Sequence, residues 1–259
     1  MEGPNWTAWE TITLEEVDST NSEARRRISA GTMRGPTWIC ARRQTAGRGR
    51  GANLWWSDSR SLTFSLVFPP LHYGLRTHQL PRVAIATAVG VIEAVEQLGV
   101  VPPGVLGIRW PNDIESIDGK KLGGILPESI RDPSGGELLV VGIGMNIATD
   151  FGNAPPAVRD MATSIERIGG VPVDVEWLLS TVLRCMDSTM TALAAETPAL
   201  FASWQARDLL RKRRAKVVIG ERTLVGEGRG IDPQGRLWLA LDDGTLEPVV
   251  AGQVLRESS

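Results

Sequence analysis

The spacing of apolar residues changes along the chain and predicts both helices and strands. In residues 79–98, and again in residues 174–196, apolar side chains return every three or four positions, as they do on one face of a helix. In residues 61–68 they alternate with small or polar side chains, which predicts a strand that ends at Pro69-Pro70. A shorter run at residues 37–41 predicts a further strand.

Three more strand-like segments follow the helix predicted at residues 79–98. They lie at residues 105–114, 121–130 and 137–147. Residues 132–136 are rich in Asp, Pro and Gly and form a turn signal, so we expect a hairpin between the last two strands. Helices beside five or more strands, several of them joined as hairpins, predict an α+β fold in which helices pack on a mixed β-sheet.

Residues 20–23 carry a helix-start signal. The sequence Thr20-Asn21-Ser22-Glu23 has the form of a capping box, in which the Thr hydroxyl and the Glu carboxylate accept hydrogen bonds from backbone amides of the first turn. We therefore expect a helix that begins at this box, with Thr20 as its cap, and that ends near Gly31.

The pattern becomes one of short strands after Arg207. They are predicted at residues 216–219, 223–230, 236–241 and 245–250. So many short strands in so little sequence predict a small β-barrel, which needs to pack on a larger core to be stable. We therefore divide the chain into a first domain, residues 1–210, and a C-terminal domain, residues 211–259. The basic run at residues 211–216 is interpreted as a solvated hinge, because no aromatic stacking platform accompanies it.

Composition narrows the class of protein. The chain of 259 residues is 42% hydrophobic and 22% charged, which is typical of a globular protein. It has no long apolar run and no basic or apolar leader, so we expect no membrane partner and no secretory signal, and its two cysteines suit the reducing cytoplasm. The chain has only two cysteines, Cys40 and Cys185, which excludes a disulfide framework and a Cys-rich metal site. It has only two histidines, His72 and His78, which we expect on surface loops, and this excludes a His-rich metal site. A net charge of −2 argues against general nucleic-acid binding.

In one segment of the chain, all the charged side chains are positive. Residues 24–57 contain eight arginines and no Asp or Glu, which indicates an anionic ligand, although Arg25–Arg27 alone would be a solvated helix face. Within the segment, Gly47-Arg48-Gly49-Arg50-Gly51 combines glycines that permit close approach with guanidiniums that bind carboxylate or phosphate oxygens. The alternative is a flexible linker. The spacing matches neither the dinucleotide fingerprint nor the phosphate-binding loop of NTPases.

Three further clusters combine polar side chains with glycine or proline. Arg109-Trp110-Pro111-Asn112-Asp113 ends a predicted strand, and Lys121-Leu122-Gly123-Gly124-Ile125-Leu126 begins one. Gly142-Ile143-Gly144-Met145-Asn146 is a strand whose glycines let another group approach the backbone. Taken singly, each cluster also fits a structural role: a turn, a hairpin with surface lysines and a packed strand.

In their order and spacing these clusters resemble the biotin–protein ligase family. The resemblance extends from about residue 11 to residue 256, and the tail at residues 228–235 is similar to the family's C-terminal barrel. The other matching residues are Asp18-Ser19-Thr20-Asn21, Gln44, Gly47-Arg48-Gly49-Arg50, Trp55-Trp56-Ser57, the three clusters above and, more weakly, Ala162-Thr163-Ser164.

The resemblance implies a class II synthetase-like catalytic domain followed by an SH3-like barrel. It also implies a two-step reaction, in which biotin and MgATP give biotinyl-5′-AMP and pyrophosphate, and a lysine of a biotin carboxyl carrier protein or domain then takes the biotin. An Arg-Gly loop that closes over the ligands would offset converging negative charge and exclude water.

Site residues follow from the same resemblance. Arg48, Lys121 and Asp113 would be catalytic, and Asp113 would hold the Mg²⁺ that accompanies ATP. Phe151 is the candidate for covering the adenine. Biotin would be held by Ser19, Thr20, Asn21, Gln44, Gly47, Arg48, Trp55, Lys121, Gly124 and Ile125. ATP would be held by Arg48, Arg50, Arg109, Asn112, Lys121 and Asn146.

The chain departs from the family pattern in three places. Arg109 stands where many relatives have Lys, and residues 51–54 carry none of the further basic residues that many relatives have. About 17 residues precede the Asp18 motif, too few for the helix-turn-helix domain of some relatives, so we expect no DNA partner. The oligomeric state stays open.

Two alternatives remain open beside biotin ligation. A lipoate or octanoate ligase or transferase on the related scaffold would also hold an acyl carboxylate beside a lysine, but the Gly-Arg-Gly-Arg loop and the C-terminal barrel favour biotin. A non-catalytic biotin-binding sensor would bind the ligand without transferring it. The presence of both Arg48 and Lys121 argues against a sensor.

Overall fold

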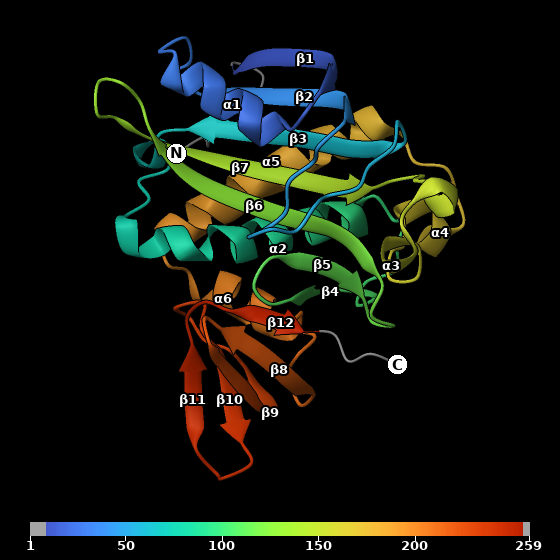
Figure 1. Ribbon diagram of the computed structural model, residues 1–259, viewed down its shortest axis with the longest axis vertical. Helices are drawn as coiled ribbons and strands as arrows, with labels where there is room; N and C mark the ends of the chain where they lie inside the picture. Colours follow the sequence, from blue (N-terminus) through green and yellow to red (C-terminus); the bar gives the residue numbers. More distant parts are fainter. Residues whose placement is uncertain (1–8, 256–259) are drawn as a thin grey trace.

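A seven-stranded sheet runs through the first domain of the computed structural model, which describes residues 9–255 (Figure 1). The strands lie in the order β1-β2-β3-β7-β6-β5-β4. Since β1 and β2 are parallel and every other neighbouring pair is antiparallel, the sheet is mixed, as predicted. The strands are β1 Glu10–Val17, β2 Thr37–Gln44, β3 Ser61–Phe68, β4 Leu106–Arg109, β5 Asp113–Ser116, β6 Lys121–Arg131 and β7 Glu137–Asn146.

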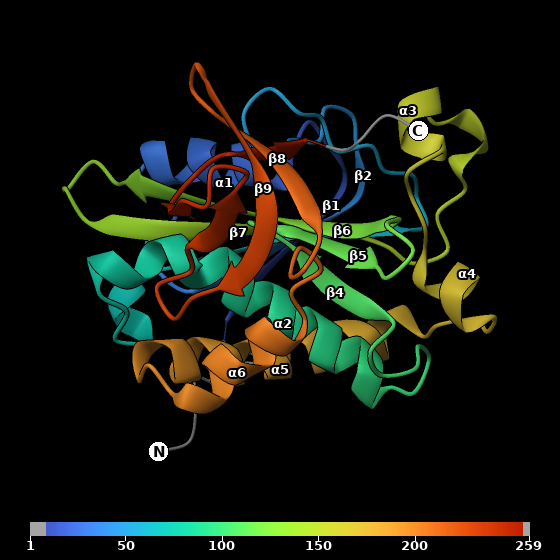
Figure 2. The ribbon, with the colours of Figure 1, turned by 90° about the horizontal axis from the view of Figure 1, so that it is seen from below.

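Helices cover the two faces of this sheet (Figure 2). On one face, α2 (Val83–Gln97) and α5 (Val175–Ala194) pack against each other and α6 (Pro198–Ala206) joins them, whereas α1 (Thr20–Ser29) lies on the other face. The alternation of side chains along β3 explains why different helices cover the two faces of the sheet. Phe64 and Leu66 belong to the large core that includes α2 and α5, while Ser65 between them hydrogen-bonds side chains of α1. The polar side of β3 therefore faces α1.

Two predicted elements are divided in the structure. The segment 105–114 forms β4 and β5 with a turn at residues 110–112, because the Trp-Pro pair interrupts the strand and the chain reverses into an antiparallel hairpin. The helix predicted over residues 79–98 begins as a 3-10 helix, Thr77–Arg82, which contains Pro81, and becomes α-helical only at Val83.

The capping box predicted at Thr20 is wrong. Ser19 is the cap residue of α1, and no side chain caps the helix. The Thr20 hydroxyl instead donates to Oε1 of Gln44, and the carboxylate of Glu23 pairs with Arg26 and Arg27. A tertiary hydrogen bond and local ion pairs have thus replaced the two local backbone contacts of the motif. The end of the helix agrees with the prediction, because Gly31 follows it with φ +69°.

The C-terminal domain is a five-stranded antiparallel sheet in the order β11-β10-β9-β8-β12. Its strands are β8 Arg214–Ile219, β9 Arg222–Ile231, β10 Leu237–Leu241, β11 Leu246–Val249 and β12 Gln253–Leu255. The basic run 211–216 is not the solvated hinge that we expected, because residues 214–216 belong to β8, where Ala215 is buried and Arg214 pairs with Asp242. Four of the five strands match predicted segments; β12, of three residues, is too short to give a pattern.

This sheet packs on the first domain, as expected. Its apolar residues belong to the same core cluster as α2 and α5. Between β9 and β10, the carbonyl of Pro233 accepts from the buried Arg82 at 3.0 Å, and the carbonyl of Gly235 accepts from Nε1 of Trp110 at 2.9 Å. The C-terminal domain therefore contacts the turn that joins β4 to β5.

The remaining helices are short and were not predicted. They are α3 Pro156–Arg159, α4 Ile165–Gly169 and the 3-10 turns η2 Pro70–His72 and η4 Phe151–Asn153. His72 was expected on a surface loop but is half-buried in η2 beside the rings of Trp9, Phe68 and Tyr73. Between residues 9 and 255, no helix has both the length and the apolar character that crossing a bilayer requires.

Candidate active site

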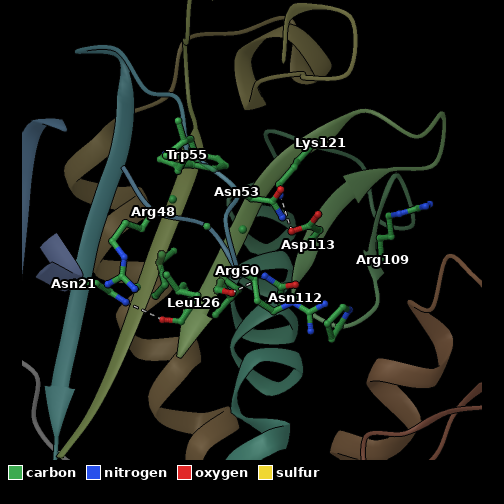
Figure 3. Close-up of a pocket in the computed structure, with 18 of the residues that line it drawn as sticks. Asn21, Arg48, Arg50, Asn53, Trp55, Arg109, Asn112, Asp113, Lys121 and Leu126 are labelled. Atoms are coloured by element: carbon green, nitrogen blue, oxygen red, sulfur yellow. Dashed lines mark hydrogen bonds and ion pairs between the residues drawn. The ribbon is translucent and has the colours of Figure 1, made fainter. Parts of the chain in front are cut away.

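A cavity of about 440 Å³ opens where the loop after β2, the start of α1 and the hairpins of β5, β6 and β7 meet (Figure 3). Strand β12 of the C-terminal domain forms one part of its wall. The residues that line the cavity are Ser19, Thr20, Asn21, Gln44, Arg48, Gly49, Arg50, Asn53, Leu54, Trp55, Arg109, Trp110, Pro111, Asn112, Asp113, Lys121, Gly124, Ile125, Leu126, Gly142, Ile143, Gly144, Gln253, Val254 and Leu255.

Thirteen of the predicted site residues lie on this wall. They come from segments that are far apart in sequence, which the fold brings to one place. They are Ser19, Thr20, Asn21, Gln44, Arg48, Arg50, Trp55, Arg109, Asn112, Asp113, Lys121, Gly124 and Ile125.

Gly47 and Asn146 lie beside the cavity rather than on its wall. A side chain at Gly47 would come within 2.4 Å of the carbonyl oxygen of Trp55, so only glycine fits at this position of the loop. Asn146 is buried at the end of β7, and its amide donates to the carbonyl of Thr163 at 3.0 Å. Phe151 packs in a separate small cluster that includes Trp56.

The Arg-Gly loop is a small hairpin. The amide of Gly49 donates to the carbonyl of Asn53 at 2.8 Å, and the amide of Trp55 donates to the carbonyl of Gly47 at 2.8 Å. Gly51 supplies the turn with φ +64°. This hairpin directs the side chains of both arginines of the motif to the cavity.

A polar network forms the end of the cavity beside α1. Gln44 Oε1 accepts from the backbone amide of Thr20 at 2.7 Å and from the Thr20 hydroxyl at 3.2 Å. The buried Ser65 hydroxyl lies 2.7 Å from both the Thr20 hydroxyl and Asn21 Oδ1. Gly142 on β7 lies against Asn21, because a Cβ at this position would come within 2.3 Å of Asn21 Oδ1. These contacts fix the orientation of polar groups that can recognise a neutral ligand with both donors and acceptors.

An ion pair lies on the opposite wall. Lys121 Nζ donates to Asp113 Oδ1 at 2.6 Å, and the two side chains are 31% and 24% exposed. The ammonium also lies 6.0 Å from the ring centroid of Trp55. A partly exposed ammonium in a cavity can bind phosphate oxygens as a point charge.

Arg48 and Arg50 have different environments. The guanidinium of Arg48 makes two contacts with Glu128 of β6, NH1 to Oε2 at 3.0 Å and NH2 to Oε1 at 2.9 Å. Figure 3 shows the Arg48 side chain reaching toward Asn21 and away from Lys121 and Asp113. Arg50 donates to the carbonyl of Gly252. Burial lowers the pKa of Arg50 and outweighs the nearby negative charge of Asp113, which raises it. The two cations of the loop are thus held by different parts of the fold.

Strand β12 was missing from the sequence-based site. Its residues Gln253, Val254 and Leu255 line the cavity, and the carbonyl of Leu255 accepts from Arg109 at 2.8 Å. Glu128 was missed as well. Alternation on β6 is the signal that finds it, because every second residue from Gly124 lies on the same face of the strand.

Within residues 9–255, no three His, Cys, Asp or Glu side chains gather as a ready-made metal cage. The described residues of the cavity therefore do not offer a complete set of protein ligands for a metal.

Two family models match the chain in the positions of its two domains. The model described as the biotin/lipoate A/B protein ligase family matches residues 13–146. The model described as the biotin protein ligase C terminal domain matches residues 213–256.

Curated relatives and solved structures agree with these matches. The chain is 31% identical to the biotin–[acetyl-CoA-carboxylase] ligase of Mycobacterium tuberculosis, over 98% of this chain and 90% of that protein. It is 28% identical to the bifunctional ligase/repressor BirA of Escherichia coli, over 95% of this chain and 74% of that protein. The biotin protein ligase of Aquifex aeolicus in complex with biotin and ATP superposes with a TM-score of 0.78 at 27% identity, over 96% of this chain and 99% of the other.

Proposed function

This chain belongs to the biotin/lipoate A/B protein ligase family, and from that premise we propose the reaction that its cavity carries out. The carboxylate of biotin attacks the α-phosphorus of ATP, which forms biotinyl-5′-AMP and releases pyrophosphate. The amine of a lysine on a carrier domain then attacks the acyl carbon, which forms an amide and releases AMP. One observation carries the proposal: Arg48 and Lys121 lie on the wall of the same cavity as the polar network of Thr20 and Gln44.

The polar network would hold the ureido ring of biotin. This ring presents N–H donors and a carbonyl acceptor, so its site needs both kinds of partner. Thr20, Asn21 and Gln44 offer hydroxyl and amide groups that are fixed by bonds to one another, to Ser65 and to backbone. Trp55, Gly124 and Ile125 would then contact the apolar rings and chain.

The cations would act on the reacting groups. A carboxylate that attacks a triphosphate brings two anions together, so fixed positive charge is worth more in the transition state than in either substrate. Lys121 is held in place by Asp113 and would meet the carboxylate and α-phosphate oxygens. Arg48 would meet the same carboxylate and the phosphate, with Arg50, Arg109 and Asn112 beside the remaining phosphates.

Mg²⁺ would arrive with ATP as part of the substrate. Such ions are commonly held by one or two protein carboxylates together with substrate phosphates and water. Asp113 is the carboxylate on the cavity wall, which supports its assignment as the protein ligand. Asn146 would act indirectly, because its amide donates to the carbonyls of Thr163 and of Lys121, whose side chain lines the cavity.

The C-terminal domain supports biotin over lipoate. The family name covers ligases for both acids, but the match to a biotin protein ligase C-terminal domain over residues 213–256 is specific to the first. Strand β12 of this domain also lines the cavity, so the domain would help to exclude water from the reactive adenylate.

The carrier would be the biotin carboxyl carrier domain of an acetyl-CoA carboxylase, the substrate named for the mycobacterial relative. We propose that the reaction takes place in the cytoplasm, where the free thiols of Cys40 and Cys185 would stay reduced. We also propose that the protein binds no operator DNA, which a gel-shift titration against biotin-operon DNA would test.

The experiment that tests the function combines purified protein, biotin, MgATP and a carrier domain. We expect pyrophosphate release that depends on biotin and a carrier band that streptavidin detects. Release with lipoate and none with biotin would establish the lipoate alternative, and tight biotin binding without release or label would establish a sensor.

A further inference from the structure

Glu128 connects three elements around the cavity without lining the cavity itself. It lies on β6, and its side chain is 14% exposed. Its carboxylate accepts from Asn21 at 2.8 Å and from Arg25 at 2.9 Å, both on α1. The same carboxylate makes the paired contact with Arg48, at 3.0 and 2.9 Å. One acidic group thus joins the helix, the strand and the Arg-Gly hairpin.

We propose that Glu128 is a positioning residue that holds Arg48 beside the cavity in the empty protein and competes for it with the anionic groups of the substrates. This inference rests on the proposed function, because it takes the competing anions to be the biotin carboxylate and the α-phosphate of ATP.

The chemistry of the contact supports competition. A guanidinium binds a carboxylate best through two parallel N–H···O bonds, and Arg48 already makes this paired contact with Glu128. The carboxylate of biotin offers the same geometry. Because NH1 and NH2 are both engaged, Arg48 gives up at least part of the pair with Glu128 when it binds a substrate in the same way.

The surroundings of Glu128 make this exchange feasible. Burial raises the pKa of Glu128, but the hydrogen bonds from Arg48 and Asn21 outweigh burial and hold the pKa below its usual value, so the group is anionic. When Arg48 leaves, Arg25 and Asn21 still compensate that charge. The exchange therefore does not leave an unpaired buried carboxylate, which is the costly outcome of breaking a buried ion pair. Arg48 is itself 38% exposed and has room to turn.

The contrast with Lys121 shows that only one of the two cations has to move. Lys121 and its partner Asp113 both line the cavity, so a substrate can join their ion pair where it stands. Arg48 lines the cavity but Glu128 does not, so a ligand that binds Arg48 through both NH1 and NH2 has to draw it away from Glu128. The backbone of Arg48 also forms a β-bridge with Leu54 across the hairpin, so the Arg48 side chain and the loop are expected to shift together.

If Glu128 competes with the substrates for Arg48, removal of its charge should increase the affinity for biotin. Glu128→Gln keeps the shape of the side chain but removes the charge that holds Arg48. If the pair with Glu128 occupies Arg48 most of the time, we expect this variant to bind biotin up to about fivefold more tightly in calorimetry. Structural damage at β6 would weaken binding, so tighter binding separates the two roles.

A double-mutant cycle tests whether the effect passes through Arg48. In an Arg48→Ala background, Glu128→Gln should leave biotin affinity unchanged, because no guanidinium remains to be released. Arg25→Gln is the matched control, since it removes another cationic partner of Glu128 and leaves the Arg48 contact in place. We expect its biotin affinity to stay within about twofold of the unsubstituted protein.

Unchanged or weaker biotin binding by a folded Glu128→Gln protein would overturn the inference, as would an equal gain in the Arg48→Ala background. If Glu128→Gln does not fold, the same comparison is made with Glu128→Asp, whose shorter side chain loses the paired geometry, and the same two results decide. Failure of the proposed function looks different, because the unsubstituted protein would then neither bind biotin nor release pyrophosphate with it.

Discussion

Lys121 Nζ lies 2.6 Å from Asp113 Oδ1, across the antiparallel pair of strands β5 and β6. Gly124 is the residue opposite Asp113 in the register of the two strands. A Cβ at Gly124 would lie 3.5 Å from Lys121 Nζ, an ordinary contact distance, so the ion pair lies directly over Gly124. The strand register therefore sets the position of the ammonium before any substrate enters.

Replacement of Lys121 tests this arrangement. Lys121→Ala removes the charge that would meet the carboxylate and α-phosphate, so both half-reactions should fall on the order of 10²- to 10³-fold, while biotin binding should be retained. Pyrophosphate release and transfer from pre-formed biotinyl-5′-AMP measure the two steps separately. Lys120→Ala is the control, because the Lys120 side chain donates to the carbonyl of Asp160 instead of lining the cavity. Labelling at the normal rate by Lys121→Ala would refute the role given to Lys121.

A single methyl group at Gly142 should weaken biotin binding. The added Cβ would come within 2.3 Å of Asn21 Oδ1, and Asn21 cannot turn away freely because it bonds Leu126, Glu128 and Ser65. Overpacking of this kind costs about 1–3 kcal/mol, and only a displacement of Asn21 from the polar network relieves it, so we expect Gly142→Ala to raise the Kd for biotin on the order of tenfold. Gly35→Ala is the control, since a Cβ there meets nothing within 4 Å. A Kd equal to that of the control would show that Asn21 does not contact the ligand.

Local patterns in the sequence predicted most of the strands but missed β1 and β12, and most of the cavity wall was predicted from the family resemblance. Alternation identified β3 with its bounds, and the motifs around Gln44, Arg48 and Lys121 come together in one place. Contacts between distant segments were beyond these patterns. Thr20 has the local signature of a helix cap, but a hydrogen bond to Gln44, 24 residues away, replaced that role. The pairing of Arg48 with Glu128 joins residues 80 apart in sequence, and no spacing rule connects them.

The pH dependence of stability should carry a contribution from Asp208, which lies between the two domains and is 9% exposed. Burial raises its pKa from the usual 3.8 to about 6, although the amide of Leu210 donates to it. The folded state therefore favours the protonated form. This contribution to stability is fully present below pH 3.8 and is lost as the pH rises through 6.

Asp208→Asn should remove this dependence. At pH 7 we expect the free energy of unfolding to rise by at most about 3 kcal/mol relative to the unsubstituted protein, with little difference near pH 4. Urea unfolding followed by tryptophan fluorescence at both pH values measures the change. Asp160→Asn serves as the exposed control. A difference that is the same at the two pH values would rule out titration of Asp208 as its cause.

The Arg-Gly hairpin should close over the cavity when both ligands bind. Residues 44–54 hold their shape through few backbone hydrogen bonds, including Gly49 to Asn53, and Arg48 is tied to Glu128 on the side away from Lys121. Ligands that attract both arginines should draw the hairpin over the cavity, so the amides of residues 44–54 should exchange hydrogen more slowly with biotin plus ATP than without them. Mass spectrometry of peptides from this segment measures the change, and the β9–β10 turn at residues 232–235 provides an internal reference. Because closure needs the anions to engage Arg48, the added protection should largely disappear in Arg48→Ala. Equal exchange with and without ligands, in a protein that binds both, would mean that the hairpin is already in its final position.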